Sequence, residues 1–262
     1  MKLQLIGGGK MGQALAGGLL SSGWLRPEEL TIVEVVAELR AALETLFPGV
    51  KVAEVPLPEV DTILAVKPWS IVEVAAGLVR PGRVLSIAAG VTLGTIEAAL
   101  PTGTPVIRSM PNTPALLAAG ASALAGGASA TEADLDWATQ ILAAVGQVVV
   151  VTESQIDAVT GLSGSGPAYF FLVGEALADA GVAVGLPRAT AELLAYQTML
   201  GSARMLLESG DPASVLRAGV TTPAGTTAAG TSQLERHGVR AAMIAAVEAA
   251  TDRSRELGRP AT

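Results

Sequence analysis

The run Gly7-Gly8-Gly9-Lys10-Met11-Gly12, which follows a short apolar stretch, most constrains what this chain can fold into. It matches G-x-G-x-x-G, in which the first glycine permits a tight turn, the second lets the backbone approach a pyrophosphate, and the third allows close helix–strand packing. Residues 2–6 predict a strand and residues 10–23 a helix. A helix that starts in such a turn directs free N–H groups toward an anion. We therefore predict a dinucleotide-binding loop that includes Ile6; an ordinary glycine-rich turn is the alternative.

The rest of the first 152 residues alternates between strand-like and helix-like stretches. Strands are predicted at residues 30–35, 62–66, 83–88, 105–109 and 147–151, and helices at residues 37–47 and 133–144. Such alternation indicates parallel βαβ units with helices on both faces of a sheet. After residue 152 no β-rich run recurs, and apolar residues fall at helical spacing over residues 167–181, 187–208 and 240–257. The predicted fold class is therefore α/β: a Rossmann-type domain over residues 1–152, followed by an all-helical domain over residues 153–262.

Composition excludes several classes of function. The chain has no cysteine and one histidine, His237, so we expect no disulfide, no thiolate catalysis and no metal site, and we interpret His237 as structural. A net charge of −7 without any Lys/Arg cluster argues against nucleic-acid binding. Apolar stretches are short and interrupted by glycine, serine or acidic residues, so we expect no membrane span. A cysteine-free chain fits a cytoplasmic location.

Glu34 bears on the choice of cofactor. It ends the second predicted strand, 22 residues after Gly12, where an acidic side chain accepts hydrogen bonds from the adenosine ribose hydroxyls. Its charge would also repel a 2′-phosphate, by roughly 1 kcal/mol in water and about 4 kcal/mol at an effective dielectric of 20 for charges about 4 Å apart. Glu34 therefore favours NADH, although a solvated glutamate is the alternative and NADPH use stays open.

Two further segments would lie at the carboxyl edge of the sheet, where ligands of such folds bind. They are Ala65-Val66-Lys67-Pro68, after the predicted strand at residues 62–66, and Ile87-Ala88-Ala89, at the end of the strand at residues 83–88. Their small residues leave room for a cofactor. Lys67 could contact a phosphate or a ribose, and a solvated lysine at a strand end is the alternative.

Three more stretches go beyond a generic dinucleotide fold. They are Arg-Ser-Met-Pro-Asn-Thr-Pro at residues 108–114, Asp-Ala-Val-Thr-Gly-Leu-Ser-Gly-Ser-Gly-Pro-Ala-Tyr at residues 157–169, and Val-Thr-Thr-Pro-Ala-Gly-Thr-Thr at residues 220–227. With residues 65–68, they resemble the pyrroline-5-carboxylate reductase family from the first strand to about Leu257. The resemblance implies hydride transfer from NADPH or NADH to a cyclic imine, which forms proline in the final step of its synthesis. It also implies a homodimer formed by the helical domain, a site at the dimer interface, and higher assemblies such as a pentamer of dimers.

The resemblance also implies roles for individual residues. It assigns to Thr227 a hydroxyl near the imine nitrogen, which orients this nitrogen and stabilises the charge that develops on it. The substrate carboxylate needs hydrogen-bond donors, and the backbone N–H groups of a loop before a helix can supply them. The remaining substrate residues are Val220, Thr222, Gly225, Thr226, Ser163, Gly164 and Glu153, and Asn112 would lie near the nicotinamide. The alternatives are a Thr-rich helix cap, a capping turn at Ser163, a solvated Glu153 and an Asx-turn at Asn112.

The sequence departs from the family pattern at a few positions. Ala224 stands where the loop usually has glycine, and it is strained if the position needs a positive φ. Ala218 and Gly219 stand where relatives often carry an acidic or amide residue, so one polar contact to ligand would be missing.

Two other functions compete with the reductase. A related imine or hydroxyacid oxidoreductase on the same architecture is one, but hydroxyacid dehydrogenases typically use a lysine in the helical domain, and this chain has none beyond Lys67. A non-catalytic dinucleotide-binding protein is the other, and the altered loop leaves room for it.

Overall fold

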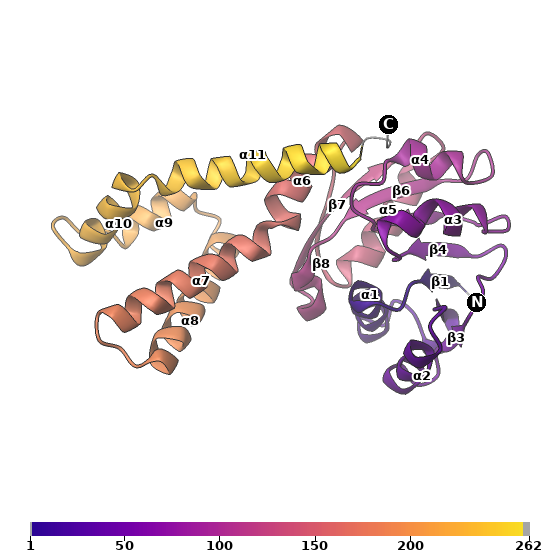
Figure 1. Cartoon of the computed structure of the whole chain (residues 1–262), viewed down its shortest axis with the longest axis horizontal. Helices are drawn as coiled ribbons and strands as arrows, with labels where there is room; N and C mark the ends of the chain where they lie inside the picture. Colours follow the sequence, from indigo (N-terminus) through magenta and orange to yellow (C-terminus); the bar gives the residue numbers. More distant parts are fainter. Residues whose placement is uncertain (1, 259–262) are drawn as a thin grey trace. The chain divides into compact units, whose positions relative to one another are not determined.

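The computed structural model describes residues 2–258 and separates into two compact units (Figure 1). The first unit holds the residues up to Ser165 together with those from Glu248 onward, and the second is Gly166–Val247. The predicted boundary after residue 152 follows the last strand, whereas the division by compactness comes at Ser165. The difference arises because residues 153–165 pack on the sheet; Ile156, for example, is 1% exposed.

The first unit is built on an eight-stranded sheet with the order β3-β2-β1-β4-β5-β6-β7-β8. The strands are β1 (Leu3–Ile6), β2 (Leu30–Val33), β3 (Lys51–Ala53), β4 (Asp61–Leu64), β5 (Val84–Ser86), β6 (Val106–Met110), β7 (Gly120–Gly126) and β8 (Gly146–Val150). Neighbouring strands are parallel except for β6 and β7, which pair antiparallel. The predicted parallel βαβ arrangement is confirmed, and β3 and β7 are strands that the sequence analysis did not predict.

Helices cover both faces of this sheet. They are α1 (Lys10–Ser21), α2 (Ala37–Leu46), α3 (Ile71–Ala76), α4 (Leu93–Ala98), α5 (Glu132–Ala143) and α6 (Ile156–Val159). Successive strand residues face opposite sides, so Ile63 packs in one core with α1 and α5, while Leu64 packs in another with α3 and α4. Because helices cover both faces, β1, β2 and β5 are buried at every residue, including polar ones such as Gln4 and Ser86.

The second unit is helical. It comprises α7 (Gly166–Ala183), α8 (Arg188–Glu208), α9 (Ala213–Gly219), α10 (Thr226–Arg236) and the start of α11 (Val239–Leu257). Beyond β8, the described part of the chain contains no strand, which confirms the predicted helical second half. Small residues bring α7 and α8 together: a Cβ at Gly181 would lie 2.8 Å from the Ala191 Cβ.

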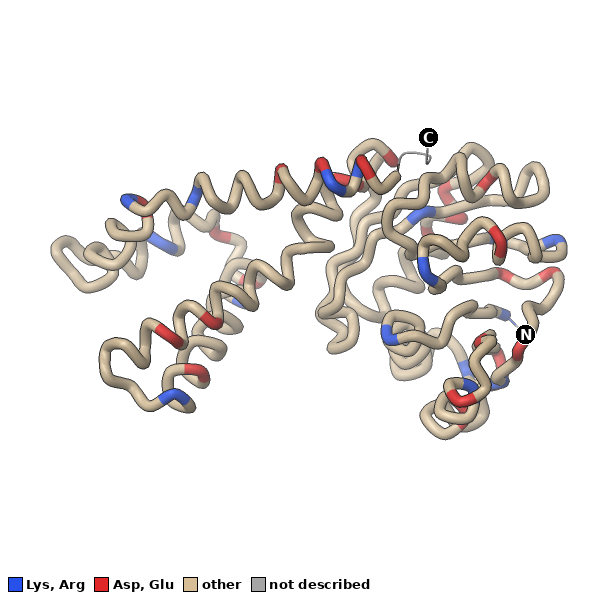
Figure 2. The backbone as a smooth tube through the Cα atoms, in the orientation of Figure 1, with Lys and Arg blue, Asp and Glu red and all other residues tan. Residues whose placement is uncertain are grey.

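Much apolar surface of the second unit is exposed. Figure 2 shows long uncharged stretches along α7 and α8. Phe170, Phe171 and Leu172 are each about two-thirds exposed, and Leu207 is 81% exposed. Apolar surface on this scale marks an interface. Among residues 2–258, no helix combines the length and the apolar character that a membrane crossing requires.

Helix α11 begins in the second unit and ends in the first. Its last turns are anchored in the first unit, where the Ser254 hydroxyl donates to the Asp157 carboxylate at 2.7 Å. Ser254 and Thr251 are both buried, and Leu257 lies against Gly90. The chain therefore returns to the sheet domain after it has formed the helical unit.

Candidate active site

The glycine-rich turn after β1 has the geometry of a dinucleotide loop. Gly7 has a φ of +107°, and a Cβ there would lie 2.6 Å from the Ala65 carbonyl oxygen, so only glycine fits. A Cβ at Gly12 would collide with the Gly7 carbonyl oxygen. Beside Gly9, by contrast, no heavy atom of the described residues, apart from Gly9 and its chain neighbours, lies within 4 Å of the Cβ position. The three glycines thus have the environments that their predicted roles require.

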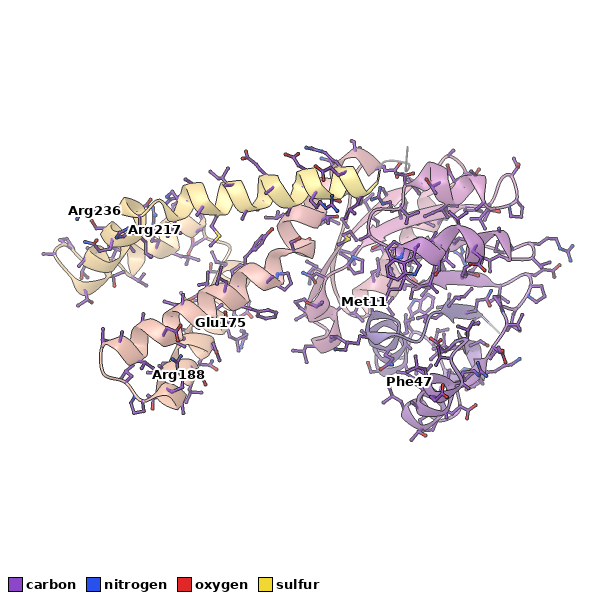
Figure 3. The ribbon with its side chains drawn as sticks, viewed as in Figure 1. Met11, Phe47, Glu175, Arg188, Arg217 and Arg236 are labelled. Atoms are coloured by element: carbon purple, nitrogen blue, oxygen red, sulfur yellow. The ribbon has the colours of Figure 1, made fainter. Side chains whose placement is uncertain are left out.

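The start of α1 offers unused donors. Gly9 is its N-cap in extended backbone, no side chain caps the helix, and its first turn carries no acidic residue. Gln13 Nε2 donates to the Gly8 carbonyl at 2.7 Å and holds the turn in place. The N–H groups of Lys10 and of Met11, which is labelled in Figure 3, therefore lack a side-chain acceptor at the helix end. Open space at Gly9 and an uncapped helix start fit a bound pyrophosphate.

Glu34 lies directly beside this turn. Its Oε2 accepts from the Gly8 N–H at 2.9 Å and its Oε1 accepts from the Val36 N–H at 3.0 Å. The residue is only 9% exposed, so the alternative of a solvated glutamate does not hold. A carboxylate has about four acceptor positions, so each oxygen can still accept from a ribose hydroxyl.

Arg40 is the nearest arginine to this carboxylate along the chain. Its Nη1 donates to the Glu34 and Val35 carbonyls at 2.9 and 2.8 Å. Its Nη2 pairs with the exposed Glu54 at 3.3 Å. The guanidinium is therefore already engaged by the backbone around β2 and by a carboxylate.

The predicted segments at the carboxyl edge of the sheet lie next to the glycine-rich turn. The Ala65 N–H donates to the Ile6 carbonyl at 2.8 Å, and the Ile87 N–H donates to the Leu64 carbonyl at 3.1 Å. Residues 65–68 and 87–89 therefore follow neighbouring strands at one edge, together with the turn that starts at Gly7. Lys67 is exposed at the same edge.

Asn112 joins two other predicted residues. Its Nδ2 donates to the Ser163 carbonyl at 3.0 Å, and its Oδ1 accepts from the Ala121 N–H at 2.8 Å. Ser163 and Gly164 belong to a π-helical turn, η5 (Thr160–Gly164), of the kind often found at functional sites. A Cβ at Gly164 would lie 2.6 Å from the Met110 Cε, so this turn packs closely on the end of β6. The Asn112 side chain thus bridges β7 and the π-helical turn.

Glu153 has partners that the sequence did not reveal. It begins the short 3₁₀ turn η4 (Glu153–Gln155), and its Oε1 accepts from the Leu93 N–H at 2.6 Å and from Arg108 Nη1 at 3.1 Å. The Arg108 side chain is 4% exposed, against 35% for Glu153. A spacing of 45 residues gives no sequence signal for this pair.

The loop before α10 presents a second uncapped helix start, in the second unit. The Gly225 N–H donates to the Thr222 carbonyl at 3.0 Å and closes a turn in which Ala224 has a φ of +55°. Gly225 is the N-cap of α10, and no side chain caps it, so the alternative of a Thr-rich cap does not hold. Thr226 and Thr227 form the first turn. Thr227 is half-buried, and no described group hydrogen-bonds its hydroxyl.

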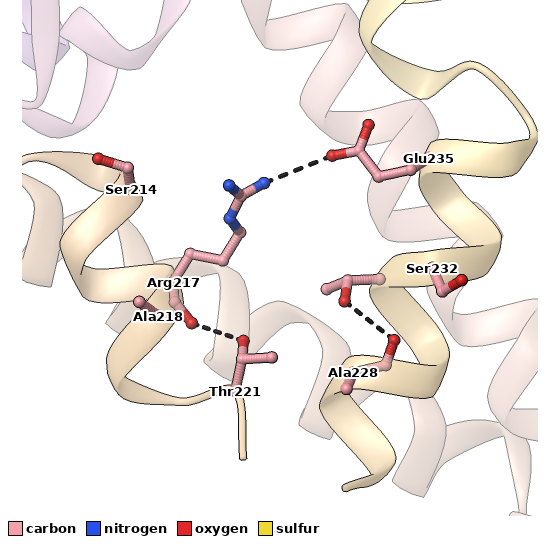
Figure 4. A pocket seen from close by; sticks show the side chains of 8 residues that line it. Ser214, Arg217, Ala218, Thr221, Ala228, Ser232 and Glu235 are labelled. Atoms are coloured by element: carbon pink, nitrogen blue, oxygen red, sulfur yellow. Dashed lines mark hydrogen bonds and ion pairs between the residues drawn. The ribbon is translucent and has the colours of Figure 1, made fainter. Parts of the chain in front are cut away.

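A hollow in the second unit lies between α9 and α10 (Figure 4). It measures about 430 Å³ and is lined by Ser214, Arg217, Ala218, Thr221, Ala228, Thr231, Ser232 and Glu235. Arg217 pairs with Glu235 at 3.4 Å across it. Hydrogen bonds from the Arg240 guanidinium lower the pKa of the Glu235 carboxyl. None of the predicted substrate residues lines this hollow, so we do not assign it to the substrate.

Known proteins resemble this chain over nearly its whole length. A family model described as pyrroline-5-carboxylate reductase dimerisation matches residues 153–257. A curated pyrroline-5-carboxylate reductase from Methanosarcina acetivorans is 46% identical, with 98% of each chain covered. This chain belongs to the pyrroline-5-carboxylate reductase family. The reductase of Mycobacterium leprae is 42% identical over 98% of this chain and 96% of its own.

Solved structures of the family have the same fold. The pyrroline-5-carboxylate reductase of Coxiella burnetii has a TM-score of 0.90, 35% identity and 99% coverage of both chains. The Plasmodium falciparum enzyme, solved with NADP bound, has a TM-score of 0.84 at 27% identity and covers 99% of this chain and 98% of its own. A family model described as NADP oxidoreductase coenzyme F420-dependent matches residues 2–90. The predicted fold class is confirmed, and the cofactor is a nicotinamide dinucleotide.

The predicted site residues form separate groups. The glycine-rich turn, Glu34 and residues 65–68 and 87–89 share one sheet edge, while Asn112 contacts Ser163. Val220, Thr222 and residues 225–227 lie in the second unit. The roles of these residues in binding and catalysis stay predictions.

Proposed function

We propose that this chain reduces pyrroline-5-carboxylate to proline and that Thr227 is its catalytic residue. The observation that carries this role is the uncapped start of α10, where a hydroxyl without a described partner stands among free backbone donors. The bound coenzyme supplies the hydride that adds to the imine carbon. As the C=N double bond becomes single, its electron pair moves to the ring nitrogen, which takes a proton from solvent to give the amine. The Thr227 hydroxyl hydrogen-bonds this nitrogen, orients it and stabilises the charge that develops there.

On this proposal, the first unit holds the coenzyme. Backbone N–H groups of Gly9, Lys10 and Met11 bind its pyrophosphate, and Glu34 binds the adenosine ribose. Residues 65–68 and 87–89 line the edge along which it extends, and Asn112 stands on the nicotinamide side. This assignment is supported by the open space at Gly9 and by the buried position of Glu34 beside Gly8.

The substrate carboxylate is bound by the turn before α10. Thr222, Gly225 and Thr226 offer backbone or hydroxyl donors there, and the helix dipole favours an anion. The family resemblance adds Val220 of the second unit and Ser163, Gly164 and Glu153 of the first unit as further substrate residues. The missing side-chain cap at Gly225 supports this part of the proposal, because it leaves the donors unused.

We further propose that NADH is preferred over NADPH. The Glu34 carboxylate is held by two backbone N–H groups, so it cannot easily turn away from a 2′-phosphate. At an effective dielectric of 20, a charge about 4 Å away would cost about 4 kcal/mol. Arg40, which could offset this repulsion, is engaged by two carbonyls and Glu54.

A homodimer completes the proposal. The exposed apolar residues of α7 and α8 give the second unit a surface that a second copy would cover. A pentamer of dimers and a cytoplasmic location are further parts of the proposal. Light scattering on the purified protein gives the mass, and a monomer at micromolar concentration would contradict the dimer.

The decisive test is an assay of pyrroline-5-carboxylate reduction with each coenzyme. We expect turnover with both and a higher kcat/KM with NADH. Turnover with neither coenzyme would refute the proposed function, whereas a higher kcat/KM with NADPH would refute only the preference.

A further inference from the structure

The segment between β5 and α4, residues 87–92, ends where the Glu153 carboxylate hydrogen-bonds the first residue of α4. It contains Ile87, Ala88 and Ala89. Its residues Ala88 and Val91, and Leu93, the first residue of α4, are almost fully buried in the core on the α3 and α4 side. Glu153, 60 residues further along the chain, accepts the Leu93 N–H at 2.6 Å. A carboxylate acceptor makes this a strong hydrogen bond, and it fixes the end of the segment where α4 begins.

Arg108 determines where that carboxylate lies. It stands on β6, and its Nη1 donates to the same Glu153 oxygen that accepts from Leu93. Its side chain is 96% buried, with an exposed fraction of 4%. The Arg108 Nε is buried and has no hydrogen-bond partner among the described residues. The positive charge of the guanidinium is balanced by the Glu153 carboxylate. A buried arginine and a carboxylate on separate elements hold each other in one geometry.

We infer that Glu153, fixed by Arg108, is a positioning residue that sets the conformation of residues 87–92 against the nicotinamide half of the coenzyme. This inference rests on the proposed function, which places residues 87–89 of this segment along the coenzyme, on the side of β1 opposite to β2 and Glu34. On this inference, Arg108 fixes the Glu153 carboxylate, and the main function of Glu153 is to accept the hydrogen bond from the Leu93 N–H. The adenosine half is held by the glycine-rich turn and Glu34, which have no hydrogen bond to Glu153.

The test compares two double variants that differ only at residue 153, where one keeps an acceptor oxygen and the other does not. Arg108→Met with Glu153→Gln removes both charges but keeps an oxygen for the Leu93 N–H. Arg108→Met with Glu153→Ala removes the acceptor as well, and methionine fills the space that arginine leaves in both. The dissociation constants of NADH and of ADP-ribose, which lacks the nicotinamide, are measured on the full chain, with thermal melting as the check of folding.

We expect the variant without the acceptor to bind NADH about tenfold more weakly than its partner, with ADP-ribose affinities within about twofold. Glu97→Ala is the matched control, because Glu97 lies on the same helix α4 and accepts the Ala128 N–H at 2.6 Å. It should lower the melting temperature while both dissociation constants stay within about twofold of wild type.

Several results would overturn the inference. One is equal NADH binding by the two double variants; another is an equal loss for NADH and ADP-ribose, which would indicate general loosening. A raised KM for the imine with unchanged NADH binding would make Glu153 a substrate contact instead. Wild-type protein that neither binds NADH nor reduces the imine would refute the proposed function itself.

A third variant covers the case in which a double variant does not fold. Glu153→Asp keeps the charge beside Arg108 but shortens the reach to Leu93. It should weaken NADH binding by about threefold or more and leave ADP-ribose unchanged. Equal affinities of Glu153→Asp and wild type for NADH would overturn the inference in that case.

Discussion

Ala224→Gly should make the protein more stable. Ala224 has a φ of +55°, a left-handed conformation that costs an L-residue about 1–2 kcal/mol and glycine almost nothing. The side chain is exposed, so its removal forfeits little packing. Glycine gives the unfolded chain more freedom, which offsets about 0.4–1 kcal/mol. The difference is therefore about 0–1.6 kcal/mol, with a central value of about 0.8 kcal/mol, or roughly 2–3 °C in Tm.

Thermal and urea unfolding, followed by circular dichroism at one protein concentration, measure this gain. Ala118→Gly is the matched control, because Ala118 has a φ of +54° and lies outside the predicted substrate loop. Both variants should be stabilised by similar amounts. If Ala118→Gly is stabilised but Ala224→Gly is not, the loop at Ala224 is not strained. If neither variant is stabilised, the stability gain estimated from the positive φ is refuted.

Three further variants test the proposed site. Thr227→Ala should lower kcat about 10–100-fold with the NADH dissociation constant unchanged, because it removes one hydrogen bond to the reacting nitrogen; wild-type kcat would reject this role. Glu34→Gln removes the charge and keeps one oxygen that can accept from either the Gly8 or the Val36 N–H, so the ratio of kcat/KM for NADPH to that for NADH should rise about tenfold. Glu34→Ser should shift the ratio the same way and weaken NADH binding further, and an unchanged ratio in both would remove Glu34 from coenzyme selection. Gly12→Ala forces a Cβ against the Gly7 carbonyl oxygen, so NADH should bind at least about tenfold more weakly and the free energy of unfolding should fall by about 1–3 kcal/mol. Normal NADH binding by this variant would contradict the described loop.

Local signals predicted most of the fold. The glycine-rich turn, the apolar strands and the helices of the second half could be read from periodicity and from glycine and proline positions, and α8 begins one residue after Pro187. Strand β7 could not be predicted because its sequence, Gly-Ala-Ser-Ala-Leu-Ala-Gly, has low strand propensity. It is a strand because β6 and β8 pair with it on both sides. Such pairing is tertiary and leaves no periodic pattern in the strand itself.

The candidate site likewise has parts that the sequence could predict and parts that it could not. The turn at Gly7–Gly12 could be predicted because its geometry is local, whereas the loop at Gly225–Thr227 was singled out by the family resemblance. The bond from Glu153 to Leu93 and the pair with Arg108 join segments 60 and 45 residues apart. Only the folded sheet brings them together, so a resemblance could name Glu153 but could not identify its partners.

The return of α11 to the sheet domain limits how the protein can be divided. A fragment that stops at Ser165 would lack Thr251, Ser254 and Leu257, and it would leave Asp157 and Gly90 uncovered. To obtain the coenzyme-binding half alone, residues 248–258 would have to be joined to it through a short linker. Such a spliced protein is the natural starting material for measuring coenzyme affinity without the oligomer.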